Sequence, residues 1–467
     1  MTALLRVSAG VLLALCVTAG AFGQVAIDWG GSLTTTSTVQ SVPEDSDDDT
    51  VLNSERLVLY FSAPLGQRWE FVSQAAATFN SEPVFAVDAE KLYVQNTIDF
   101  SDETVERDVE QSDSLLQLVT RLGRFSLTEP TGLVLTHPVD GVNLTVNGVR
   151  SRIDLGLGYS GFVNNEFSRL SMSLEDSIDA EDDQVYFGPA RLVGRGTLAF
   201  PNLIAGQNLS LAFAFQQDLR DSDEVIQDGT TPENRSNSGG LLDTQYAIVH
   251  LDGSVPGVGS LFYGIDYIFN TGRTIGLLVD NSVDAGESYQ YKPVRAHLLR
   301  GNLSYFMSDF FSSAARVGVT YSSGDEDYQS FVEGNTSGQA TMFTAATPAG
   351  TGAVFGLQSG NSTIAEVSWG MRPFSGDGGL IETLFARAAL YTYFRSTAEG
   401  PVSAATVDAG SSGSYLGNEI DLDFRWRPFS DLGVGLTTGF LFANDDVLVA
   451  GSDSFEYVIR LNASLSF

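Results

Sequence analysis

The sequence predicts an all-β protein, a transmembrane antiparallel β-barrel of about 18 strands, with 16 strands as the alternative. Three observations predict it. The last thirteen residues alternate apolar and mostly polar side chains and end on Phe467. After the amino-terminal leader, no stretch approaches the roughly 18 apolar residues of a membrane helix, and a chain without such helices spans lipid only as a closed barrel. The 48 glycines and 11% aromatic residues are typical of strands and turns.

The carboxyl-terminal strand shows the alternation most clearly. Successive side chains point to opposite faces of a strand, so one face here meets an apolar phase and the other meets water. Thirteen residues is long for a globular strand, whereas about ten tilted residues cross a bilayer core. The strand resembles the terminal signal of Gram-negative outer-membrane barrels, which implies an outer-membrane location and the barrel-assembly machinery as a partner. We expect this signal to comprise Tyr457, Ile459, Leu461, Leu465 and Phe467.

Residues 1–23 are expected to be a cleaved secretory signal peptide. Arg6 supplies a basic start, residues 7–17 are apolar, and small residues at 21–23 offer a cleavage site. The only cysteine, Cys16, lies within this leader. A lipoprotein would need small residues just before Cys16, and Leu15 fits that pattern poorly. Residues 24–467 are therefore expected to form a single barrel domain without cysteine.

Nineteen alternating segments follow one another without a shift in composition. They span residues 25–35, 56–61, 68–78, 91–100, 115–125, 142–149, 152–162, 191–200, 208–216, 243–251, 261–269, 274–279, 295–306, 310–321, 362–372, 381–394, 415–427, 432–442 and 455–467. Single-chain bacterial barrels have even strand numbers, so one segment is wrong. The alternation loses phase between residues 251 and 291, and we expect the miscounted hairpin there.

Short turns and long polar loops divide the connections into two kinds. Short turns occur near residues 64–66, 148–151, 201–206, 307–309, 373–379 and 428–431, and long segments span 39–53, 164–184, 218–240, 324–361, 395–414 and 443–454. Barrels of this class have short periplasmic turns and long outer loops. Much of the formal charge of −33 lies in these loops. It excludes nucleic acid, which requires basic patches, and is typical of a solvated acidic surface.

Charged side chains mark the strand faces that point into the barrel. Within 415–427, Leu416, Ile420, Leu422, Phe424 and Trp426 are expected to face lipid, and the charged residues between them are expected to face inward. Consecutive inward charges cannot form a dry core, so the lumen is predicted to hold water. The predicted lumen-lining residues are Arg152, Asp154, Arg316, Glu366, Arg372, Arg387, Glu419, Asp421, Asp423, Arg425 and Arg460. The alternative is a lumen that is plugged or closed by this charge network.

Several motifs suggest chemistry but lack the context for it. Residues 156–161 match a dinucleotide fingerprint, yet they lie in a strand and no helix follows. The acidic run 45–49 lacks the glycine and glutamate of a calcium loop, which leaves room only for weak divalent-cation binding at the loops. His137, His250 and His297 are scattered without metal-ligand spacing. No catalytic residue, cofactor or dedicated metal site is predicted, and the protein is not expected to be an enzyme.

Residues 415–428, followed by 432–443, resemble the closing hairpin of the alginate-export family of eighteen-stranded porins. That family often shows a Gly-x-Glu-x-Asp strand, here Gly417 to Asp421, then a short turn and a strand with an aromatic end. Residues 122–125 and 140–142 resemble its Gly-Arg and Asp-Gly segments. The similarity covers about thirty residues well. It implies an eighteen-stranded porin whose arginine-lined path conducts an acidic polysaccharide.

The pattern as a whole predicts a passive channel for small hydrophilic solutes, including sugars or oligosaccharides. The alternative is a surface-exposed barrel that acts as an adhesin or binds cations through acidic loops such as 324–361, which is expected to be flexible. A transporter of the long-chain fatty-acid type ranks lower, because residues 24–53 show no apolar helix that would serve as a plug. Outer-membrane lipid is the remaining expected partner.

Overall fold

The computed structural model describes residues 27–41, 50–80, 85–100, 116–170, 176, 185–219, 242–279, 287–328, 338–376 and 378–467. The signal peptide expected at residues 1–23 lies outside the described residues. In the part that is described, no helix is long and apolar enough to cross a membrane.

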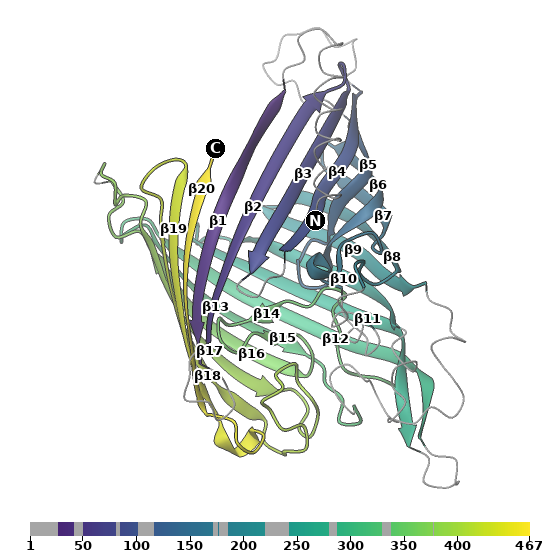
Figure 1. Cartoon of the computed structure of the whole chain (residues 1–467), viewed down its shortest axis with the longest axis vertical. Coiled ribbons are helices and arrows are strands. Elements are labelled where there is room, and N and C mark those ends of the chain that lie inside the picture. The colour runs from purple at the N-terminus through teal and green to yellow at the C-terminus, as the bar shows by residue number, and fades with distance from the viewer. Residues whose placement is uncertain are drawn as a thin grey trace.

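Eighteen strands form one antiparallel sheet that closes on itself (Figure 1). Each strand pairs with the next, and β20 pairs with β1. The strands are β1 (Asp28–Gln40), β2 (Thr50–Pro64), β3 (Trp69–Asn80), β4 (Phe85–Asp99), β5 (Leu116–Thr128), β6 (Thr136–Gly148), β7 (Arg152–Tyr159), β8 (Arg191–Ile204), β9 (Gln207–Asp218), β10 (Leu242–Ser254), β11 (Leu261–Val279), β12 (Glu287–Met307), β13 (Ser313–Ser322), β16 (Ser362–Met371), β17 (Phe385–Arg395), β18 (Tyr415–Trp426), β19 (Leu432–Ala443) and β20 (Phe455–Ser466). The predicted all-β barrel of 18 strands is confirmed.

The connections between the barrel strands contain short strands and 3-10 helices. Strands β14 (Gly350–Thr351) and β15 (Leu357–Gln358) form a separate two-stranded sheet between β13 and β16. The 3-10 helices η1 (Asn165–Phe167) and η3 (Asp445–Val447) each begin after an asparagine, Asn164 or Asn444. That asparagine's side-chain oxygen accepts a backbone N–H of the first turn, as a capping residue does.

The nineteenth segment of the sequence analysis does not exist as a separate strand. Residues 261–269 and 274–279 belong to one strand, β11, which pairs without a break along β12. The phase of the alternation is lost there because both faces of the strand are apolar. Tyr267 and Phe269 face outward, and Ile268 between them is fully buried inside the barrel.

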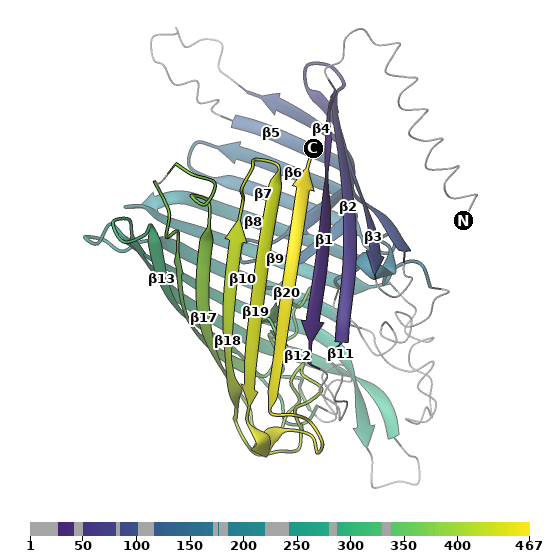
Figure 2. The ribbon, with the colours of Figure 1, turned by 60° about the vertical axis from the view of Figure 1, so that its left-hand side comes forward.

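The two ends of the barrel differ in their connections. Because every pairing in the ring is antiparallel, alternate connections lie at the same end. The turns β2–β3, β6–β7, β8–β9, β10–β11, β12–β13 and β18–β19 are short and lie at one end, where the longer β16–β17 connection also lies. At this same end β1 begins and β20 ends (Figure 2). We call it the short-turn end and the opposite one the long-loop end. Phe467 extends the closing pair, since its N–H donates to the Gly31 carbonyl at 3.0 Å and its carbonyl accepts from Gly31 at 2.9 Å.

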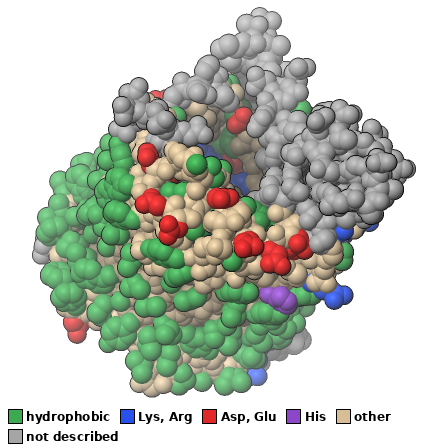
Figure 3. All heavy atoms as spheres, turned by 90° about the horizontal axis from the view of Figure 1, so that it is seen from below, with side chains coloured by type: hydrophobic (Ala, Val, Ile, Leu, Met, Phe, Trp, Pro, Cys, Tyr) green, Lys and Arg blue, Asp and Glu red, His purple; other side chains and the backbone are tan. Residues whose placement is uncertain are grey.

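The outer surface of the barrel is apolar. Leucine, valine, isoleucine and aromatic side chains stand exposed at alternate positions of the strands, and green side chains cover the sides of the barrel in Figure 3. Four of the expected assembly-signal residues belong to this surface, namely Ile459, Leu461, Leu465 and Phe467, while Tyr457 is partly buried. Such a surface suits lipid, and it makes the chain a membrane-spanning barrel. Recognition of these residues by the assembly machinery stays a prediction.

One predicted orientation is wrong. Leu416 was expected to face lipid, but its side chain is 1% exposed and packs with Tyr393 and Leu441 inside the barrel. The register between β17 and β18 shifts beside Tyr393, and the extra residue reverses the direction of the side chains beyond it. Gly417 has a φ of 153°, and a Cβ there would lie 2.6 Å from the carbonyl oxygen of Phe442. Glycine permits this irregularity, which turns Leu416 inward.

Candidate functional site

The connection between β13 and β16 folds into the barrel. We call its described residues 338–361 the inner segment. Ala340 exchanges two backbone hydrogen bonds of 2.9 Å with β12, and the carbonyl of Thr344 accepts the Tyr246 hydroxyl of β10 at 2.7 Å. The N–H of Thr347 donates to Val134, in the β5–β6 loop, at 2.8 Å. The carbonyl of Thr351 then accepts the Tyr393 hydroxyl of β17 at 3.2 Å. The inner segment therefore crosses the lumen from β10 and β12, past the β5–β6 loop, to β17.

An apolar anchor holds the first half of the inner segment. Met342 and Phe343 are fully buried. Phe343 packs edge-on against Tyr246, with ring centroids 6.4 Å apart. The surrounding cluster joins inward side chains of β10, β11 and β12, including Ile248, Ile268 and Leu298. Burial of these side chains is the main force that keeps this half of the segment inside the barrel.

A polar anchor holds the second half. The Glu419 carboxylate of β18 is 0% exposed and accepts the N–H groups of Val354 and Phe355 at 2.7 and 3.1 Å, as well as the Tyr393 hydroxyl at 2.9 Å. The neighbouring Asp421 carboxylate accepts the N–H of Ala353 at 3.1 Å. Two inward carboxylates thus fix three consecutive backbone amides.

A second loop enters the lumen from the opposite side. Residues 129–135 join β5 to β6, and Val134 and Leu135 are fully buried. The Glu129 carboxylate organises this loop, because it accepts the N–H groups of Thr131 and Val134 at 2.5 and 2.9 Å. The Thr131 carbonyl accepts Nη2 of Arg300 on β12 at 3.3 Å. Both loops therefore narrow the lumen.

A cavity of about 150 Å³ lies between these loops and the wall formed by β12 to β17. Leu133 of the β5–β6 loop and residues 349–351 of the inner segment line one side. Arg300, Arg316, Glu366 and Tyr391 line the wall. Both polar and apolar groups line the cavity, and its two arginines are Arg300 and Arg316.

Ion pairs lie on the inner face of the barrel from β10 to β18, and we call their members the charge girdle. The girdle comprises Asp252, His250, Asp266 and Arg300 on β10 to β12, and Arg316, Glu366, Arg387 and Asp423 on β13 to β18. In the first group, Asp266 bridges Nδ1 of His250 at 2.5 Å and Nε of Arg300 at 2.6 Å, and Nε2 of His250 lies 3.0 Å from Asp252. In the second, Arg387 bridges Glu366 at 2.9 Å and Asp423 at 3.3 Å. Arg316 lies 4.0 Å from Glu366.

The predicted lumen residues fall into several groups. Arg316, Glu366, Arg387 and Asp423 belong to the girdle, and Glu419 and Asp421 form the polar anchor. Arg152 lies 3.2 Å from Asp154, which also pairs with Arg195 at 2.6 Å. Arg460 pairs in register with Thr437 beside the girdle. Arg425 is exposed near the short-turn end of β18, and Arg372 lies beyond the end of β16, in the turn.

Sequence reasoning missed half of the girdle. His250, Asp266 and Arg300 lie on β10, β11 and β12, where apolar inward residues obscure the alternation. Asp266 and Ile268 lie two residues apart within the expected segment 261–269 and therefore share a face, and this parity would have identified Asp266. The inner segment gave no such signal, because its composition of small and polar residues also suits an outer loop.

The mouth at the long-loop end is acidic. Figure 3 looks into the barrel from this end, and Asp and Glu side chains gather around the opening while Lys or Arg side chains are visible deeper in the hollow.

Comparison with known proteins supports the fold. No family profile matches the chain, and no curated protein matches it in sequence. Among solved structures, Pseudomonas aeruginosa OpdQ is similar with a TM-score of 0.53 at 11% identity, covering 94% of this chain and 98% of that one. OccK8 (OprE) from the same organism gives a TM-score of 0.52 at 11% identity, with coverage of 94% and 98%. OpdO from the same organism gives 0.52 at 12%, with 94% and 97%. The chain is an eighteen-stranded antiparallel β-barrel with the fold of these Pseudomonas proteins.

Proposed function

We propose that this protein is a passive outer-membrane channel for small hydrophilic solutes, including sugars or oligosaccharides. The observation that carries the proposal is the inner segment, which crosses the lumen and leaves a cavity lined by charged side chains. Solutes would cross along their gradient through the space between the inner segment and the girdle. Their size would be limited by the two infolded loops, and their charge by the girdle.

Water access to the girdle supports a conducting lumen over a plugged one. The side chain of Arg316 is 44% exposed and that of Arg387 30% exposed, although both lie on inward faces of the barrel. Ion pairs in a dry plug would lose this hydration at a large cost in free energy. A hydrated girdle is the arrangement that a selective pore requires.

The girdle argues against acidic polysaccharide as the preferred solute. Three arginines in it face four carboxylates, and each arginine lies within 4.0 Å of one. A path for a polyanion needs arginines whose charge is not already balanced. The resemblance to alginate exporters therefore supports the barrel class more than the substrate.

Purified full-length protein in planar bilayers tests the proposal. We expect discrete conductance steps, and we expect proteoliposomes to admit small sugars and to exclude large ones. Tight liposomes and a silent bilayer, obtained with a preparation that shows the β-rich spectrum of a folded barrel, would refute the channel and favour a barrel that acts through its outer loops.

A further inference from the structure

The outward face of β9 to β12 changes from apolar to polar toward the long-loop end. The strand register orders these residues in rows. One row places Phe213, Ala247 and Phe269 side by side, as expected on a lipid-facing surface. The next row toward the long loops contains Phe215, Gln245, Thr271 and Arg295. On β10 and β11, polar side chains therefore replace the apolar side chains of the row before.

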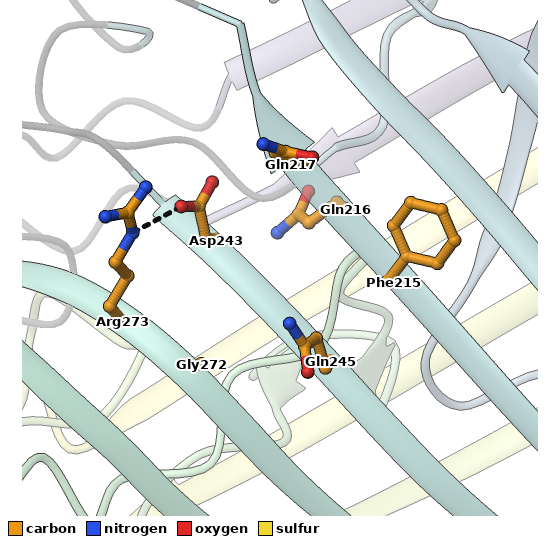
Figure 4. A pocket seen from close by; sticks show the side chains of 7 residues that line it. All are labelled: Phe215, Gln216, Gln217, Asp243, Gln245, Gly272 and Arg273. Carbon is orange, nitrogen blue, oxygen red and sulfur yellow. Dashed lines mark hydrogen bonds and ion pairs between the residues drawn. The ribbon is translucent and has the colours of Figure 1, made fainter. Parts of the chain in front are cut away.

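A recess of about 440 Å³ lies in this polar region (Figure 4). Its lining residues are Phe215, Gln216, Gln217, Asp243, Gln245, Gly272 and Arg273. A Cβ at Gly272 would lie 2.1 Å from the Asp243 carbonyl oxygen, so glycine permits the close approach of β10 and β11 at the floor of the recess. The recess therefore offers amide groups, a carboxylate and a guanidinium beside an aromatic ring.

Arg273 is held in place from two sides. Its Nε donates to Asp243 at 2.6 Å, and its guanidinium carbon lies 4.9 Å from the centre of the Tyr291 ring. Its side chain nevertheless stays 53% exposed. Stacking on an aromatic ring and pairing with a carboxylate orient a guanidinium in advance, which lowers the entropy lost when an anion binds.

Arg295 provides a second cation beside it. Arg273 pairs in register with Pro293, so Arg295 is its diagonal neighbour on the same outward face of β12, and such neighbours are roughly 7–8 Å apart. His297 follows Arg295 on that face, and its Nδ1 lies 2.9 Å from the Tyr267 hydroxyl. Among the described residues of this surface, two arginines are set against one carboxylate, Asp243.

The place of the recess on the barrel limits what it can bind. It lies on the outer surface, directly above exposed aromatic side chains that face acyl chains, and at the end that carries the long outer loops. A ligand there must combine acyl chains with a polar headgroup. Two guanidinium groups suit phosphate, and amides suit sugar hydroxyls.

We propose that this recess binds the phosphorylated sugar headgroup of an outer-leaflet glycolipid of the lipopolysaccharide class. Arg273 and Arg295 hold phosphate oxygens, and Gln217 and Gln245 hydrogen-bond to sugar hydroxyls. The acyl chains of the same lipid lie along the aromatic side chains Phe213, Phe215 and Phe269. One glycolipid molecule is thereby held in place on the outer surface of β9 to β12.

Native mass spectrometry of the full-length protein tests this site, with lipid A, a diphosphorylated and acylated disaccharide, as the probe. We expect lipid A to remain bound to the unmodified protein, and the double variant R273Q/R295Q to lose affinity by at least about tenfold, since charge-assisted hydrogen bonds are removed. The matched control is R427Q, which removes an exposed arginine from the β18–β19 turn at the short-turn end. We expect this control to bind lipid A like the unmodified protein.

Three outcomes would overturn the proposal. Unchanged binding in R273Q/R295Q would show that the two arginines do not form the site, and equal loss in R427Q would show non-specific charge attraction. Competition by inorganic phosphate at the concentration at which lipid A binds would indicate a plain anion site. Single-channel conductance of R273Q/R295Q is measured in parallel and is expected to match the unmodified protein, because neither arginine contacts the girdle. This separates a failure of the lipid site from a failure of the channel.

Discussion

The two anchors of the inner segment hold it by different forces. The apolar anchor buries Met342 and Phe343 against β10, β11 and β12, whereas the polar anchor fixes residues 353–355 through the carboxylates of Glu419 and Asp421. Apolar packing is spread over many contacts, so the loss of one side chain leaves the rest in place. The polar anchor depends on two carboxyl groups, and Glu419 alone accepts three of its four donors. The segment should therefore be easiest to release at its second half.

Removal of the whole crossing should have the largest effect. Replacement of residues 341–357 by a short Gly-Ser linker eliminates both anchors while the strand ends at Ser322 and Ser362 remain. We expect single-channel conductance to rise several-fold, because the inner segment occupies the cross-section of the lumen. Unchanged conductance would show that the segment does not limit the pore.

Loss of the polar anchor should have the next largest effect. Glu419→Ala leaves the Tyr393 hydroxyl and the amides of Val354 and Phe355 without their acceptor, and each unpaired buried donor costs roughly 1–3 kcal/mol. We expect a larger and noisier conductance as the second half of the segment detaches. Glu399→Gln, which removes an exposed carboxylate of the β17–β18 loop, is the matched control and should conduct like the unmodified protein. Equal effects in both variants would contradict a specific anchor.

Weakening of the apolar anchor should act on stability more than on conductance. Phe343→Ala removes a fully buried ring, and such a change costs about 3–5 kcal/mol in a packed core. We expect a lower midpoint of thermal unfolding in detergent, with conductance closer to the unmodified protein than that of Glu419→Ala. A conductance change that exceeds the Glu419→Ala effect would reverse our ranking of the two anchors.

Ion selectivity should show the smallest effect. Because arginines and carboxylates nearly balance in the lumen, the acidic mouth should give mild cation preference at low salt that weakens as the Debye length falls from about 10 Å at 0.1 M to roughly 3 Å at 1 M. Arg316→Gln should increase this preference, and Glu366→Gln should decrease it. Reversal potentials across a salt gradient measure both shifts. Strong anion selectivity of the unmodified protein at low salt would show that the arginines dominate, and would favour acidic sugars as solutes.

The sequence determined the class of fold by itself. Alternation along a strand depends only on local geometry, so the pattern of residues 455–467 and of most other segments identified strands that face lipid on one side. The even strand number then indicated that one of nineteen segments was wrong. Inward charges such as Glu366, Arg387 and Asp423 followed from the same parity, because a charge on the lipid face is costly.

Only the tertiary structure decided what the lumen contains. The inner segment folds inward because β10, β11 and β12 offer it an apolar wall, and these strands lie some 40–100 residues away along the chain. That wall also explains why the alternation failed there, since a strand that packs on protein inside and on lipid outside is apolar on both faces. Leu416 depends on a one-residue register shift against β17, which no local pattern records. Contacts between segments that are distant in the sequence determine what fills the lumen. Local periodicity carries no information about such contacts.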